Sequence, residues 1–61
     1  MVNREAAKRA AMKLLERHAS ILEECDRLAY DAELNPSHAE ENFSRIEELE
    51  KEAHAIELIF S

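Results

Sequence analysis

Apolar residues recur along this chain at spacings of three and four, the period of one face of an α-helix. Asn3 is a suitable N-cap for the first such segment, which continues without a break to about residue 34. The only interruption is the segment 34–37, where Pro36 disfavours helical geometry at the residue before it. We therefore predict two helices, over 3–34 and 36–60, joined by a turn.

The short connection predicts that the two helices fold back on each other as an antiparallel hairpin. Either of two residues would cap the second helix. Asn35 would do so with Pro36 in the first helical position, and Ser37 would do so with Glu40 completing a capping box. The expected fold is an all-α single domain over residues 1–61.

The apolar face of the first helix is wider than one partner helix requires, because a second apolar row runs beside an unbroken four-three repeat. The second helix has a narrower stripe. The predicted core and dimer seam consists of Ala7, Ala11, Leu14, Leu15, His18, Ile21, Leu22, Cys25, Leu28, Ala32, Phe43, Ile46, Leu49, Ala53, Ile56 and Phe60. One hairpin would leave part of this surface uncovered, so we expect two hairpins to pair as a homodimeric four-helix bundle.

Small residues alternate with large ones along the seam, which lets helices approach closely. Together with the length and the hairpin layout, this alternation resembles, in architecture alone, the Rop-type plasmid regulators, which are dimers of short helical hairpins. The resemblance implies a dimeric bundle and transfers no function to this chain.

The composition narrows the class of protein. The chain has 61 residues, of which 46% are hydrophobic and 36% charged, with one proline and no glycine. A chain without glycine is poorly suited to the tight turns of a multi-stranded sheet, and it has no glycine-rich phosphate loop. It also lacks a Ser/His/Asp catalytic combination, so we expect neither enzyme activity nor a cofactor.

Cys25 is the only cysteine, which excludes an intrachain disulfide. Cys25 and His18 share the repeat, but about 10.5 Å of helix separates them, too far to bind one metal ion within the helix. No apolar run approaches the roughly 20 residues that cross a bilayer, and the first residues lack the apolar segment of a signal peptide. We expect a cytoplasmic protein without a metal site or membrane contact.

Charge is distributed unevenly within a net charge of −6. Residues 1–17 contain five basic and two acidic residues, whereas the rest of the chain is acidic. Arg9, Lys13 and Arg17 form a ridge at four-residue spacing, for which there are two interpretations. The ridge would bind nucleic-acid phosphates, or it would pair with the acidic second helix. The second is favoured because the ridge has almost no aromatic residues for stacking on bases.

The end of the chain is the other candidate surface, because Leu58 and Ile59 fall outside the repeat. They would contact a partner, or Ile59 would pack against Leu15 or Ala11. The leading functional prediction is a small non-enzymatic protein–protein interaction module or regulator that acts as a homodimer. The alternatives are a nucleic-acid-binding regulator and a subunit that docks on a different protein chain.

Overall fold

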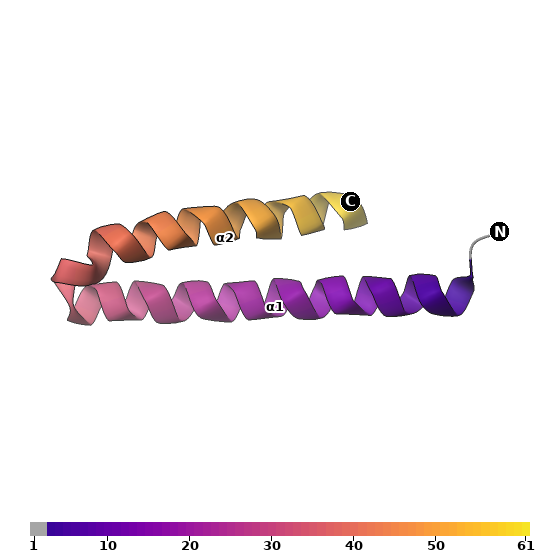
Figure 1. The fold of residues 1–61 in the computed structure, drawn as a ribbon, viewed down its shortest axis with the longest axis horizontal. Coiled ribbons are helices and arrows are strands. Elements are labelled where there is room, and N and C mark those ends of the chain that lie inside the picture. Colours follow the sequence, from indigo (N-terminus) through magenta and orange to yellow (C-terminus); the bar gives the residue numbers. More distant parts are fainter. Residues whose placement is uncertain (1–2) are drawn as a thin grey trace.

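The computed structural model describes residues 3–61. These residues form a hairpin of two antiparallel helices (Figure 1). Helix α1 covers Arg4–Leu34, a 3-10 turn η1 covers Pro36–His38, and helix α2 covers Ala39–Phe60. The molecule is 52 Å long and only one helix pair wide, and its described residues contain no strand. The predictions of an all-α fold and of a helical hairpin are confirmed.

The beginning of α1 is fixed by Asn3, as predicted. Its Oδ1 atom accepts hydrogen bonds from the backbone N–H groups of Glu5 at 2.9 Å and Ala6 at 3.3 Å. These bonds satisfy two of the N–H groups that a helix N-terminus leaves unpaired. Glu5 also places a negative charge in the first turn, where the helix dipole stabilises it.

The turn differs from the prediction, because α2 begins at Ala39, three residues later than expected. The residues from Pro36 form a 3-10 turn, and neither proposed cap operates among the described residues. The side-chain amide of Asn35 donates instead to Asp31 Oδ1 at 2.9 Å, and the α2 N-cap position, His38, makes no capping bond with its side chain. The Asn35 side chain thus bonds to Asp31 of α1 through its amide nitrogen and makes no capping bond through its oxygen.

The core lies along the seam between the helices. Ile21 of α1 and Leu49 of α2 are fully buried and form its centre. The side chains packed with them are Leu14, Cys25 and Leu28 on α1 and Ala53 and Ile56 on α2. Their spacing of three and four residues is that of two helices packed along their length. Each hairpin therefore has a continuous but thin core.

The two helices differ in length, 31 residues in α1 and 22 in α2. Phe60 at the end of α2 lines the same groove as Leu15. The first turns of α1 therefore extend past the end of α2 (Figure 1). We call Arg4–Ala11 the overhang. Ala7 is exposed there and Ala11 is half-buried.

Candidate functional site

One side of the hairpin carries charge pairs, at seven-residue intervals, that join α1 to η1 and α2. Seven residues are two helical turns, so the three α1 members lie in one row of α1, and the two α2 members lie in one row of α2. The pairs are Arg17 with Glu52, Glu24 with Arg45, and Asp31 with His38. We call this the paired side.

The Arg17–Glu52 pair is the closest of the three. The Arg17 guanidinium donates from Nε to Glu52 Oε2 at 2.5 Å and from Nη2 to Oε1 at 3.0 Å. The hydrogen bonds and the charge of Arg17 hold the pKa of Glu52 below its ordinary value. Both side chains are nearly half exposed, so the contribution of this pair to stability is small.

The Asp31 carboxylate connects both helices and the turn. Asn42 Nδ2 donates to Asp31 Oδ2 at 2.8 Å, Asn35 Nδ2 donates to Oδ1, and His38 Nδ1 lies 2.9 Å from Oδ2. The hydrogen bond from Asn42, followed by those from His38 and Asn35, lowers the pKa of Asp31. This cluster fixes how the chain leaves α1 and enters α2.

Asn42 is a seam residue that the sequence prediction missed. Its side chain is only 8% exposed, and Nδ2 also donates to the backbone carbonyl of Leu28 at 3.0 Å. A buried polar residue in a helix seam favours one register over others. Phe43, predicted for the seam, is more than half exposed. Spacing alone would have found Asn42, because it lies three residues after Ala39 and four before Ile46.

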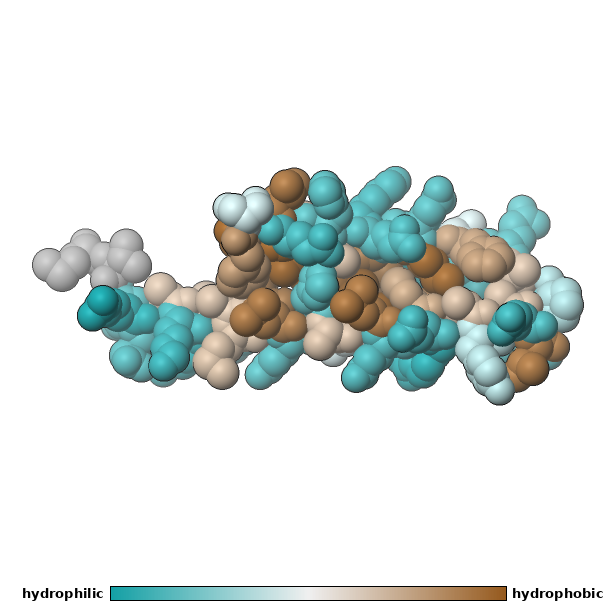
Figure 2. Space-filling model, turned by 180° about the vertical axis from the view of Figure 1, so that it is seen from behind, coloured by the Kyte–Doolittle hydropathy of each residue, from teal (hydrophilic) through white to brown (hydrophobic). Residues whose placement is uncertain are grey.

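The other side of the hairpin carries four large apolar residues whose exposed fractions lie between 47% and 55%. They are Leu15 and Leu22 on α1, and Phe43 and Phe60 on α2. We call this the open face. Figure 2 shows hydrophobic patches exposed along both helices on one side of the molecule.

Two grooves and the heptad spacing place these side chains on the same side. Leu15 and Phe60 line one groove, together with Ile56 and with the His18–Glu57 contact of 2.9 Å. Leu22 follows Leu15 by seven residues, so these two leucines lie in one row of α1. Phe43 precedes Glu57 by fourteen residues, so these two residues lie in one row of α2. Both rows therefore border the same side of the seam.

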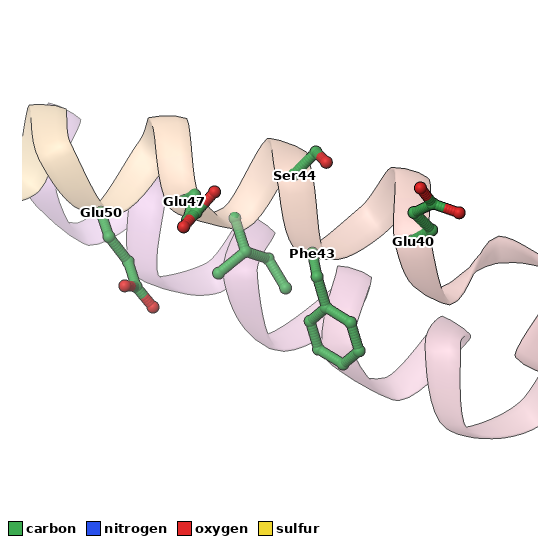
Figure 3. Close-up of a pocket in the computed structure, with 6 residues that line it drawn as sticks. Glu40, Phe43, Ser44, Glu47 and Glu50 are labelled. Carbon is green, nitrogen blue, oxygen red and sulfur yellow. The ribbon is translucent and has the colours of Figure 1, made fainter.

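The second groove lies near the turn, on α2 (Figure 3). It is lined by Glu40, Phe43, Ser44, Ile46, Glu47 and Glu50. The Phe43 ring points out of α2 between Glu40 and Glu47 (Figure 3). Aromatic and aliphatic surface is thus surrounded by carboxylates, and we call this surface the turn groove.

The predicted basic ridge is divided by the fold. Arg17 is engaged by Glu52, which also raises the pKa of the guanidinium. Arg9 and Lys13 are exposed, and no ion pair within residues 3–61 involves them. Two exposed cations on a helix surface are a common solvated feature.

Leu58 and Ile59 are 60% and 64% exposed at the end of α2. Ile59 follows Glu52 by seven residues and therefore lies in the row of the paired side, away from the open face. Leu58 follows Glu40 by eighteen residues, which is five helical turns, and therefore lies in the row of Glu40. Single exposed apolar residues are normal on small proteins.

Cys25 and His18 lie in the seam, both partly buried. Burial, followed by the negative charge of Glu50, raises the pKa of the Cys25 thiol. Within residues 3–61, no group of three or more His, Cys, Asp or Glu side chains is arranged to hold a metal ion.

Over the same described range, neither helix combines the length and apolar character needed to cross a membrane.

Comparison with protein-family models, with curated proteins and with solved structures finds no match to this chain. The open face is therefore the feature from which we infer function.

Proposed function

We propose that this protein is a small non-enzymatic protein–protein interaction module, a regulator or adaptor, that acts as a homodimer of helical hairpins joined through the open face. The observation that supports the proposal is the difference between the two sides of the hairpin. Charge pairs cover the paired side, whereas the open face leaves two leucines and two phenylalanines half exposed. Exposed apolar surface of this kind is typical of interaction sites.

The thin core supports the same proposal. Only five hydrophobic residues in the described chain are buried: Ile21, Ala32, Leu49, Ala53 and Ile56. A domain of about 60 residues buries too little surface for comfortable stability on its own, and association is one of the usual remedies. Burying the exposed half of each open-face side chain would add about 1 kcal/mol per residue.

A homodimer would leave other surfaces accessible to a regulated partner. The exposed residues Ile59, Arg9 and Lys13 lie away from the open face. Nucleic-acid binding is the weaker candidate function, because Glu52 already neutralises Arg17. Docking of the open face on a different protein chain is the main competing interpretation.

Sedimentation equilibrium over a hundredfold range of concentration tests the proposal. We expect a mass of twice the 7.0 kDa chain for the wild-type protein. Leu15→Asp, on the open face, should give monomers, because dimerization would bury a charge. Ile59→Asp is the control: an aspartate at an apolar residue of comparable exposure, in the row of the paired side, should leave the dimer intact. A folded wild-type monomer at every concentration would contradict self-association and assign the open face to another chain.

A further inference from the structure

The hairpin is charged in opposite senses at its two ends. The overhang contains three basic residues and one acidic residue, a net charge of +2. Residues 23–51, which form the turn end, contain ten acidic and three basic residues, a net charge of −7 with neutral histidine. Two copies placed side by side in the same direction would bring like charges together at both ends. Two copies in opposite directions would bring each basic end beside an acidic one.

Two of the overhang cations continue the open face. Lys8 precedes Leu15 by seven residues, and Leu22 follows Leu15 by the same interval, so these three residues share a row of α1. Arg4 lies one turn before Lys8 and borders that row. Arg9 and Lys13 lie on other faces of α1. The apolar row of the open face therefore ends in Arg4 and Lys8.

The turn groove has the complementary chemistry. Phe43 and the half-buried Ile46 supply apolar surface, and Glu40, Glu47 and Glu50 surround it with negative charge. No ion pair within residues 3–61 engages any of these three carboxylates. Glu40 and Glu50 are separated by about 15 Å of helix, and the overhang is about 12 Å long, at 1.5 Å per residue. The groove therefore matches the overhang in length as well as in charge.

We infer that two copies of this chain pair in opposite directions, and that the overhang of each copy occupies the turn groove of its partner. The inference rests on the proposed homodimer and specifies its orientation. Arg4 and Lys8 of one copy lie beside the groove carboxylates of the other, while the leucines of the two open faces pack together at the centre. This contact supplies the overhang with the neighbouring helix that its own α2 is too short to provide.

Charge reversal on the overhang is the first test. The double variant Arg4→Glu/Lys8→Glu should weaken dimerization about tenfold or more at low salt, since two pairs are reversed at each of two symmetric contacts. The variant should keep its helical circular dichroism, because acidic residues near a helix N-terminus are favourable. Arg9→Glu/Lys13→Glu changes the net charge by the same amount away from the open face, and should weaken the dimer much less.

A complementary pair of variants gives the sharper test. Glu40→Lys/Glu47→Lys should also weaken its own homodimer, because it opposes Arg4 and Lys8 with like charges. When this variant is mixed with Arg4→Glu/Lys8→Glu, both overhang contacts of the mixed dimer join opposite charges. Native mass spectrometry of the mixture should therefore show a mixed dimer far above the random proportion, and high salt should reduce the preference.

The outcomes separate this inference from the proposed function. A wild-type dimer whose variants mix at random, or for which the control weakens the dimer as much as Arg4→Glu/Lys8→Glu, refutes the antiparallel contact and leaves the homodimer intact. A wild-type protein that stays monomeric refutes both. If the open face bound a different protein, the two complementary variants would show no preference for each other.

Discussion

Two neighbouring residues of α1, Ile21 and Leu22, can separate the stability of the hairpin from that of the proposed dimer. Ile21 is completely buried between the helices, whereas Leu22 is 50% exposed on the open face. Replacing each with alanine removes a similar aliphatic side chain from adjacent positions of the same helix. Any difference between the variants therefore reports what each side chain contacts rather than helix propensity.

The Ile21→Ala change leaves a cavity beside Leu49, Ala53 and Ile56. Truncations of this kind cost about 2–5 kcal/mol in the free energy of unfolding. A domain of this length has a total stability of about 3–9 kcal/mol. The variant should therefore lose a large part of its stability at any protein concentration.

The Leu22→Ala change should act on association instead. Burying the exposed half of a leucine contributes about 1 kcal/mol, and the dimer contains two copies of the residue. The loss of about 2 kcal/mol corresponds to a roughly thirtyfold increase in the dimer Kd. The stability of the separated hairpin should change little.

Urea unfolding followed by far-UV circular dichroism, at two protein concentrations a hundredfold apart that lie on either side of the wild-type dimer Kd, measures both effects. The wild-type midpoint should rise with concentration, as mass action requires for a dimer. Ile21→Ala should lower the midpoint at both concentrations, and Leu22→Ala should lower it mainly at the higher one. An equal loss at both concentrations for Leu22→Ala would show that this residue stabilises the hairpin and not a dimer. A negligible loss for Ile21→Ala would contradict the assigned core.

Three further predictions concern the polar residues. The lowered pKa values of Asp31 and Glu52 mean that the unfolded chain binds protons more readily. Their stabilisation is therefore present above their ordinary values of 3.8 and 4.5 and lost as pH falls through the lowered pKa values. Thermal unfolding between neutral pH and acid should show this loss, and Asp31→Asn should reduce its slope. Asn42→Leu should destabilise the hairpin by about 1–3 kcal/mol in urea unfolding, because the Leu28 carbonyl and the Asp31 carboxylate each lose the hydrogen bond from the Asn42 amide. Iodoacetamide should alkylate Cys25 more slowly in the folded protein than in urea, since burial raises the pKa of its thiol; equal rates would show that the seam opens freely.

The sequence was sufficient for the helices and their antiparallel arrangement, because both follow from local features. The three-four spacing defines one face of each helix, Asn3 caps α1 from two residues away, and Pro36 marks the turn. The start of α2 was predicted three residues too early. Pro36–His38 form a 3-10 turn there, and Asn35 donates its side-chain amide to Asp31 of α1 in place of capping α2. A side-chain contact across a turn is not encoded in local propensity.

The surfaces were harder to predict than the core, because they depend on which residues face each other across the seam. The row containing Arg17 could have been read as a binding ridge until the fold placed it beside Glu52. Leu15 and Leu22 belong to the second apolar row predicted beside the repeat; they lie about 100° further around α1 than Ile21 and remain half exposed. An apolar face wider than one partner helix can cover indicates a second contact surface, but it does not indicate which molecule covers that surface.

The charge pairs of the paired side limit how the hairpin itself can be arranged. If α2 slipped by seven residues in one direction, Arg17 would face Arg45. If it slipped by seven in the other direction, Glu24 would face Glu52. Each exposed pair stabilises the native register only weakly, but either slip breaks all three native pairs and brings one pair of like charges together, and Asn42 would lose its bond to the Leu28 carbonyl.

The register determines what the hairpin can present to a partner. In the register that brings the opposite charges of the paired side together, Leu15 and Phe60 line the same groove. The apolar residues of both helices then border the same side of the seam. The same register leaves the overhang without a neighbouring helix. Polar contacts that contribute little to stability thereby decide which apolar surface remains for assembly, and hydrophobic burial on that surface supplies the free energy of association.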